Sequence, residues 1–373
     1  MKSNALTQLG SLGQSIWLDY IRRDLITGGE LRRLIDEDGL RGMTSNPSIF
    51  EKAIVESHDY EADIRDMARD GKSAKEIYEA LTQRDVQSAA DEFRPLYDRT
   101  DRKDGYVSLE VNPHLADDID GTLHEARRLW GTLDRPNVFI KIPATDQGLP
   151  VIRQLISEGI SVNVTLLFGL PRYRQVAEAY IAGTEARLAE GRSVKQVASV
   201  ASFFVSRIDA MVDPLLMAII AKGGEGAALA RTMRGQVAIA SAKLAYQIYK
   251  EMFGSDLFRR LAAQGAQAQR LLWASTGTKN PEYSDVRYVE ALIGPDTVNT
   301  APLETLAAYR DHGEPEARLE KDIVGAAGIL KRLPELGINI DEVTRQLESE
   351  GVMKFNKPFD LLMATLAKRA ERG

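Results

Sequence analysis

The sequence of 373 residues contains no cysteine. Disulfide bonds, thiol nucleophiles and cysteine-ligated metals are therefore excluded, and a reducing compartment is permitted. Imidazole is also scarce, because the only histidines are His58, His114, His124 and His312, and none is paired at the spacing of metal ligands. We expect no metal site.

Long apolar runs are absent as well. The most apolar long segment, residues 198–221, is interrupted by Arg207, Asp209 and Asp213. The first fifteen residues, MKSNALTQLGSLGQS, lack the apolar core of a signal peptide. We therefore expect no membrane span, no signal peptide and a cytoplasmic location.

The charge balance and the glycine pattern argue against two further classes of protein, nucleic-acid-binding proteins and dinucleotide-binding enzymes. The chain has 48 basic and 54 acidic residues and a net charge of -6, which argues against bulk nucleic-acid binding. No glycine-rich phosphate fingerprint follows the first expected strand, and GGEG at 223–226 follows a helical run, as is typical of a loop. We expect no dinucleotide cofactor.

Eight short apolar segments alternate with helical patterns along the chain. We expect strands at 15–21, 42–46, 106–112, 138–144, 161–168, 198–206, 270–276 and 296–302, the last being a short one. This alternation favours a parallel α/β architecture, and eight strands close a TIM barrel. An open doubly wound sheet is the alternative.

We expect one TIM-barrel domain over residues 1–373, with helical insertions at about 51–105 and 209–269. The C-terminal segment, about 302–373, contains no strand pattern and ends in an amphipathic helical pattern. Beyond packing on the barrel or covering it, no role for this segment follows from its sequence.

Lys141 lies inside the apolar stretch VFIKIPAT at 138–145. If this stretch is a buried strand, the ammonium group has no water around it, and burial lowers the pKa of a lysine. The neutral amine is the nucleophile that forms Schiff bases with carbonyl compounds. The alternative is a lysine on an edge strand whose amine reaches solvent.

Each of the first seven expected strands carries a polar residue near its carboxyl end. Active sites of TIM barrels lie at this face, whereas a purely structural barrel would place branched aliphatic residues there. Singly, each polar residue has an ordinary explanation as a cap, a turn former or a small filler; together they indicate an active site. They are Asp19, Asn46, Glu110, Lys141, Asn163, Thr165, Ser202 and Ser275.

This set suits a Schiff-base aldolase. The amine of Lys141 attacks a ketone, and loss of water from the adduct needs a proton shuttle such as Glu110 with Thr165 and a water molecule. Asp19 is the remaining carboxylate and the candidate base for aldol cleavage. Asn46 and Asn163 suit hydrogen bonds to sugar hydroxyls or to the reacting amine.

Candidate phosphate ligands follow the last of these strands. Arg207 lies just beyond the sixth strand, and Ser275, Gly277 and Lys279 lie at or just beyond the end of the seventh, where barrel enzymes often hold phosphate. A solvated surface position is the alternative for both cations.

Two motifs in order resemble the transaldolase family. MTSNPSIF at 43–50 is similar to the family's first signature, and NVFIKIPATDQGLPVIRQL at 137–155, followed by SVNVTLLF, is similar to the second, which carries the Schiff-base lysine. The resemblance extends roughly from Ile16 to Thr300. It implies transfer of a dihydroxyacetone unit from sedoheptulose 7-phosphate to glyceraldehyde 3-phosphate, in the pentose phosphate pathway, without cofactor or metal.

The resemblance also implies residue roles. Lys141 matches the Schiff-base lysine, and Asp19, Glu110 and Thr165 match the acid and base residues. The implied substrate contacts are Asn46, Asn163, Ser202, Arg207 and Ser275. One departure concerns the phosphate region, which in the family usually has an arginine two positions after the serine; here Gly277 stands there, and we expect Lys279 to substitute.

Two other functions compete. One is a related lyase that cleaves fructose 6-phosphate and releases dihydroxyacetone to water; the resemblance implies that such sequences carry tyrosine and glutamine at positions matching Phe204 and Glu110. The other is a barrel that binds sugar phosphates without turnover. In each case the partners are small-molecule sugar phosphates, not nucleic acid or membrane, and the oligomeric state stays open between monomer and homodimer.

Overall fold

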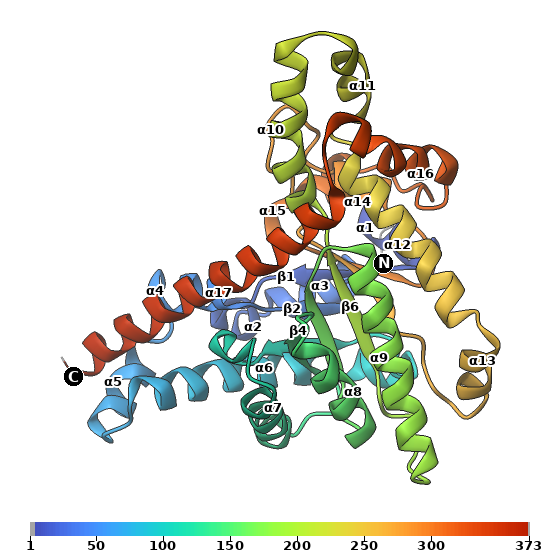
Figure 1. The fold of residues 1–373 in the computed structure, drawn as a ribbon. Coiled ribbons are helices and arrows are strands. Elements are labelled where there is room, and N and C mark those ends of the chain that lie inside the picture. Colours follow the sequence, from blue (N-terminus) through green and yellow to red (C-terminus); the bar gives the residue numbers. More distant parts are fainter. Residues whose placement is uncertain (1–3, 372–373) are drawn as a thin grey trace.

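Eight parallel strands form a closed barrel in chain order (Figure 1). The computed structural model describes residues 4–371. The strands are β1 (Gln14–Asp19), β2 (Gly42–Thr44), β3 (Tyr106–Glu110), β4 (Val138–Pro143), β5 (Val162–Leu167), β6 (Ser199–Phe204), β7 (Arg270–Ala274) and β8 (Thr297–Ala301). The predicted (β/α)8 TIM barrel is confirmed, and each expected strand overlaps an observed one. The eighth strand is not the shortest, because β2 ends at Thr44, just before the turn that starts the next helix.

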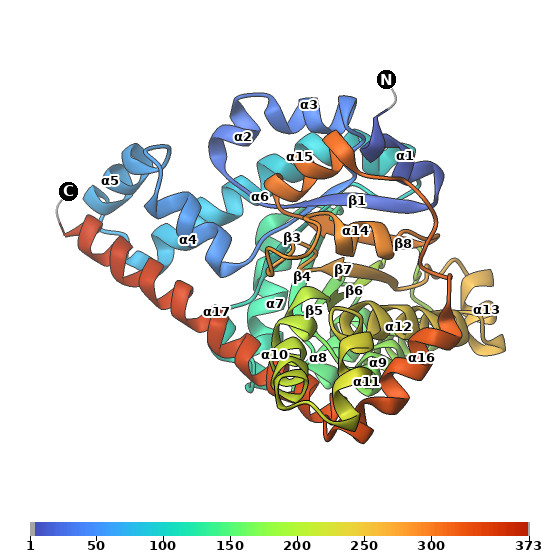
Figure 2. The ribbon, with the colours of Figure 1, turned by 90° about the horizontal axis from the view of Figure 1, so that it is seen from above.

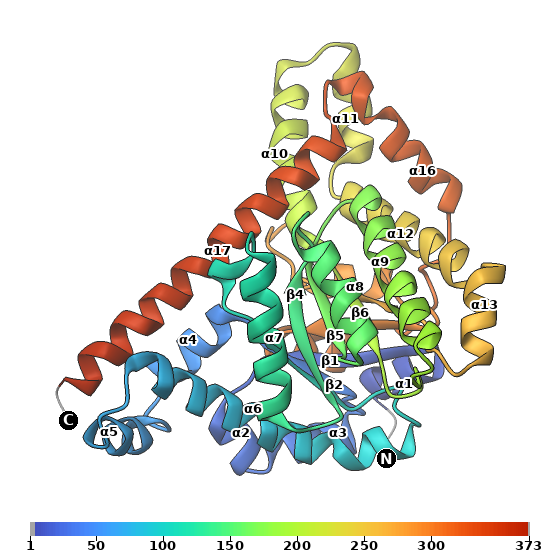
Figure 3. The same ribbon diagram turned by 60° about the horizontal axis from the view of Figure 1, so that its bottom comes forward.

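Helices surround this barrel and extend beyond it. They are α1 (Ala5–Ser11), α2 (Arg23–Thr27), α3 (Glu30–Glu37), α4 (Pro47–Val55), α5 (Glu61–Arg69), α6 (Ala74–Arg99), α7 (Ile119–Leu133), α8 (Gly148–Glu158), α9 (Leu170–Ala189), α10 (Ser206–Lys222), α11 (Glu225–Met233), α12 (Val237–Phe253), α13 (Asp256–Ala263), α14 (Arg287–Ala291), α15 (Leu303–His312), α16 (Ile323–Arg332) and α17 (Ile340–Ala370). Short 3-10 turns are η1 (Pro113–Leu115) and η2 (Leu333–Leu336). Helices α7, α8 and α9 lie side by side outside the strands (Figure 3). Among the helices of residues 4–371, none combines the length and the apolar character needed to cross a bilayer.

Local sequence signals explain where several helices start. Asn46 accepts a hydrogen bond from the backbone N–H of Ile49, and Pro47 occupies the first turn of α4. Ser73 and Glu76 form a capping box at the start of α6. Asn339 caps α17 in the same way as Asn46 caps α4, through its side-chain oxygen.

The strand register places the polar side chains near the strand ends at the same height in the barrel. Glu110 on β3 is the register partner of Lys141 on β4, and Lys141 is the partner of Asn163 on β5. Asp19 on β1 is the partner of Thr44 on β2. Since side chains alternate along a strand, these residues share the barrel interior near its carboxyl end.

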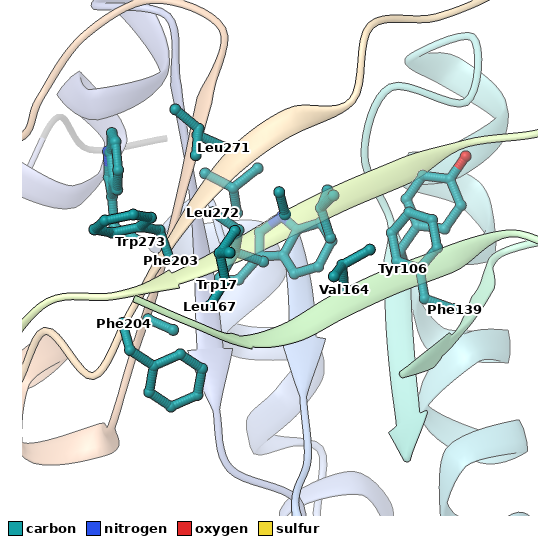
Figure 4. Packing of buried hydrophobic residues seen from close by; sticks show 14 of the residues in the cluster. Trp17, Tyr106, Phe139, Val164, Leu167, Phe203, Phe204, Leu271, Leu272 and Trp273 are labelled. Carbon is teal, nitrogen blue, oxygen red and sulfur yellow. The ribbon is translucent and has the colours of Figure 1, made fainter. Parts of the chain in front are cut away.

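Aromatic side chains fill the barrel below that level (Figure 4). Trp17 stacks on Tyr106 and on Phe139, with ring centroids 6.5 and 6.2 Å apart. Gly42 makes room for the indole, because a Cβ at this position would lie 2.4 Å from a ring atom of Trp17. The core therefore supports the polar layer from beneath.

A buried ion pair closes the opposite end of the barrel. Arg270 contacts the Asp104 carboxylate at 2.9 Å and donates to Ser15 Oγ at 3.0 Å. The second cation is Arg41, at 3.2 Å from the same carboxylate. Although burial alone would raise the pKa of Asp104, Arg270, Ser15 and Arg41 together hold it below its ordinary value. The carboxylate therefore stabilises the fold at neutral pH, and this contribution is lost as pH falls through its folded pKa.

Helix α17 passes over the carboxyl end of the barrel. It packs against α4, α5, α6 and α10 and crosses the molecule from the α10 side toward α5 (Figure 2). Through Phe355 it supplies one wall of the cavity at that end. Covering the barrel is one of the two roles expected for the C-terminal segment.

Replacing Arg270 with Met should lower the free energy of unfolding by about 3 kcal/mol, because a buried carboxylate then loses its better partner. The midpoint of urea unfolding at pH 7, followed by circular dichroism, measures this change. The double variant Arg270→Met/Asp104→Leu should regain a large part of the loss, since no buried charge is left. A double variant no more stable than the single one would contradict this account.

Candidate active site

Lys141 points into the barrel and is 4% exposed. Its Nζ donates to the backbone carbonyl of Ser45 at 2.9 Å and lies 3.3 Å from Glu110 Oε2. The alternative of an edge-strand lysine reaching solvent is therefore wrong. The amine is held in one place by groups from β3 and from the segment after β2.

Glu110 reaches Lys141 from the neighbouring strand and is itself buried. Burial raises the pKa of this carboxyl above its ordinary value, although the Lys141 ammonium opposes the rise. A carboxylate with a raised pKa, in direct contact with an amine, is well suited to accept and return a proton.

Asp19 lies at the same level on β1. Thr44 Oγ1 donates to Asp19 Oδ1 at 2.6 Å and lies 2.7 Å from Thr300 Oγ1. Burial raises the pKa of Asp19, opposed first by the Thr44 hydrogen bond and then by the charges of Lys141 and two further cations. The carboxyl is thus oriented by a hydroxyl and has the character of a base.

Lys141 and Asp19 both line a cavity of about 140 Å³. Most predicted site residues line it: Asp19, Asn46, Lys141, Thr165, Ser202, Arg207, Ser275, Gly277 and Lys279. The buried Thr165 Oγ1 has no hydrogen-bond partner among the described residues, so this hydroxyl is free to bind water or substrate. Two predicted residues, Glu110 and Asn163, do not line the cavity.

Asn163 supports the cavity floor. Ser202 Oγ donates to Asn163 Oδ1 at 2.6 Å, and Asn163 Nδ2 donates to Ser108 Oγ at 3.0 Å. Its amide is therefore engaged within the barrel, and contact of Asn163 with a substrate stays a prediction.

Positive charge gathers at the other side of the cavity. Arg207, in the first turn of α10, lies 5.1 Å from the ring centre of Phe204 and 6.0 Å from that of Phe355. Its buried Nη1 has no hydrogen-bond partner within residues 4–371. Lys279 is exposed on the segment after β7, where Ser275 adopts a positive φ of 55°. This side of the cavity suits an anion.

Five residues that line the cavity were not predicted from the sequence: Thr44, Ala274, Thr300, Pro302 and Phe355. Thr44 lies within the MTSNPSIF motif, two positions before Asn46, so alternation along β2 could have placed it inward. Thr300 belongs to the eighth strand, to which no site residue had been assigned. For Phe355 the sequence offers no signal, because only the path of α17 brings it to the cavity.

A barrel with a buried lysine, a carboxyl group in contact with it and a second carboxyl on the same cavity has the side chains that Schiff-base-forming aldolases need. No three His, Asp or Glu side chains in the described part of the chain are grouped to hold a metal ion. The fold and the site are thus those of a Schiff-base-forming aldolase.

Comparison with known proteins agrees with this class. The family model described as transaldolase/fructose-6-phosphate aldolase matches residues 16–366. A transaldolase of Trichodesmium erythraeum is 47% identical over 376 aligned residues, covering 100% of this chain and 99% of the relative. Transaldolase 2 of a Nostoc species is 49% identical, covering 98% and 97%; the transaldolase of Thiobacillus denitrificans is 45% identical, covering 97% and 99%. The chain belongs to the transaldolase/fructose-6-phosphate aldolase family.

Replacing Lys141 with Met should raise the pKa of Glu110 further, because the ammonium is the strongest influence that lowers it. Infrared difference spectra recorded across a pH series should show the protonated carboxyl band persisting to higher pH in the variant. The double variant Lys141→Met/Glu110→Gln should lack this band. An unchanged titration midpoint in Lys141→Met would show that the two groups do not interact.

Proposed function

We propose that this protein is a transaldolase of the pentose phosphate pathway. It transfers a dihydroxyacetone unit from sedoheptulose 7-phosphate to glyceraldehyde 3-phosphate and yields erythrose 4-phosphate and fructose 6-phosphate. The observation that carries the proposal is the contact of the Lys141 amine with Glu110 beside a cavity lined by Asp19. Full-length relatives named transaldolase support it.

The first half-reaction forms an imine. Lys141 passes a proton to Glu110, and its neutral amine attacks C2 of the ketose. Glu110 then protonates the departing hydroxyl of the carbinolamine, and water leaves. Thr165, whose hydroxyl is free on the cavity wall, positions that water molecule. The product is a protonated imine on Nζ.

Carbon–carbon cleavage follows from the position of Asp19. This carboxylate removes the proton of the C4 hydroxyl, and the electrons of the C3–C4 bond move toward the imine nitrogen. An aldehyde leaves, and an enamine of dihydroxyacetone stays on Lys141. Attack of the enamine on the acceptor aldehyde reverses these steps, with Asp19 returning the proton, and hydrolysis of the new imine releases the product ketose.

Transfer rather than hydrolysis is favoured by an apolar wall. Phe204 lines the cavity and packs on Phe168, with ring centroids 5.3 Å apart. A phenylalanine cannot hydrogen-bond the water that would hydrolyse the enamine-bearing intermediate. The lyase that releases dihydroxyacetone is the second candidate. A barrel that only binds sugar phosphates is disfavoured, because the lysine and both carboxyl groups are present.

The substrate phosphate group is assigned to the cationic side. Arg207 and Lys279 provide the charge, Ser275 a hydroxyl and Gly277 a backbone amide. Asn46 and Ser202 on the cavity wall suit the sugar hydroxyls.

Further predictions from the sequence belong with this proposal. They are a single domain with helical insertions, a cytoplasmic location, independence from any cofactor, and either a monomer or a homodimer.

Acceptor dependence tests the function directly. With fructose 6-phosphate alone, turnover should stop after one dihydroxyacetone unit per site, and erythrose 4-phosphate should restore steady turnover. Lys141→Met should abolish both phases, because no imine forms. Continuous release of dihydroxyacetone without acceptor would favour the lyase, and absence of both phases in the unmodified protein would refute both enzymes.

Lys279→Ala should raise the KM for fructose 6-phosphate roughly tenfold, since it removes one charged ligand of the phosphate group. Lys321→Ala, which removes an exposed lysine of the segment before α16, is the matched control and should leave KM unchanged. Steady-state kinetics with a saturating acceptor measure both values. An unaltered KM in Lys279→Ala would remove Lys279 from the phosphate site.

A further inference from the structure

Two buried aspartates on α10 have no part in the chemistry above. Asp209 and Asp213 lie one turn apart in the apolar segment after β6, and each is less than a tenth exposed. Charged residues are rarely buried without partners, so each carboxylate needs an explanation.

Each aspartate accepts one hydrogen bond from a tyrosine and one from a backbone amide. Tyr283 donates to Asp213 Oδ2 at 2.6 Å, and Tyr288 donates to Asp209 Oδ2 at 2.9 Å. The amides are those of Gly235, at 2.8 Å from Asp213, and Ala238, also at 2.8 Å, from Asp209. The same pattern occurs twice on one helix face.

The two tyrosines belong to the chain that follows β7. Residues 275–286 form neither helix nor strand, and they carry Ser275 and Lys279. Tyr283 lies within this segment and is flanked by two guanidinium groups, Arg287 at 4.7 Å and Arg234 at 5.8 Å from its ring centre. Its position is therefore defined on several sides.

This segment and α10 do not pack closely along their whole length. A cavity of about 300 Å³ lies between them, lined by Asp209, Asp213, Tyr283 and Lys279 among others. Across this space Tyr283, within the segment, and Tyr288, in α14, hydrogen-bond the helix. At the near end of α10, Ser206 also hydrogen-bonds Ser275 through its backbone N–H and its hydroxyl.

Arg207 lies in the first turn of the same helix, α10. Arg207 and Lys279 both line the catalytic cavity. Asp213 thus connects α10, which carries Arg207, to the segment that carries Lys279. Asp209 connects α10 to α14, which directly follows that segment. Burial raises the pKa of Asp209 to about 6, a cost that the fold bears for these links.

We propose that Asp209 and Asp213 are positioning residues, which act through Tyr288 and Tyr283 to hold Lys279 at the distance from Arg207 that lets both cations bind one phosphate group. The inference rests on the proposed function and deepens it. It names the side chains that position Lys279, the residue expected to substitute for the arginine that is usual in the family.

Tyr283→Phe removes one link and keeps the ring. It should raise the KM for fructose 6-phosphate roughly three- to tenfold, the effect of one lost hydrogen bond, while kcat stays within about twofold because Lys141 is untouched. Asp213→Asn should act in the same direction. Tyr246→Phe is the matched control, since its hydroxyl donates to the Pro295 carbonyl at 3.1 Å, near the opposite end of the barrel.

A double-mutant cycle with Lys279→Ala separates positioning from general loosening of the structure. If Tyr283 acts through Lys279, adding Tyr283→Phe to Lys279→Ala should raise KM no further. An equal rise in both backgrounds, a fall in kcat at constant KM, or an unchanged KM in both Tyr283→Phe and Asp213→Asn would each overturn the proposal. Thermal unfolding of every variant identifies a general loss of stability.

Failure of the proposed function gives a different result. In that case the unmodified protein shows no acceptor-dependent turnover of fructose 6-phosphate. If the unmodified protein turns over normally and the cycle is additive, only the positioning role is wrong.

Discussion

The contact between the Lys141 amine and the Glu110 carboxyl is the interaction on which the site depends. Burial raises the pKa of the Glu110 carboxyl, and the Lys141 ammonium opposes that rise. Their nitrogen and oxygen atoms lie 3.3 Å apart, a distance that suits the proton transfer we propose. Asp19 adds a second carboxyl at the same level, and the charges of Lys141, Arg207 and Lys279 favour its ionised form.

Strand register makes this contact possible, and the rest of the barrel fixes the register. Glu110, Lys141 and Asn163 are partners across three neighbouring strands, so a shift of one residue would turn the lysine out of the barrel. The aromatic layer of Trp17, Tyr106 and Phe139 lies beneath, and Arg270 with Asp104 closes the far end.

Much of this arrangement could be predicted from the sequence. Three of its features are local sequence patterns: eight apolar segments, one lysine within an apolar strand, and a polar residue near the end of each of the first seven strands. The burial of Lys141 and the placement of Asp19, Thr165, Arg207 and Lys279 on one cavity agree with them. What the sequence could not show depends on distant chain segments. Phe355 reaches the cavity only because α17 crosses the barrel, and the links from Asp213 to Tyr283 join residues 70 positions apart.

Chemical trapping of the imine tests the central claim most directly. Borohydride added with fructose 6-phosphate should reduce the imine and leave a three-carbon adduct on the peptide that contains Lys141, as measured by mass spectrometry. The Lys141→Met variant should carry no adduct. An adduct on another lysine, or none in the unmodified protein, would contradict the assignment of this buried amine as the nucleophile.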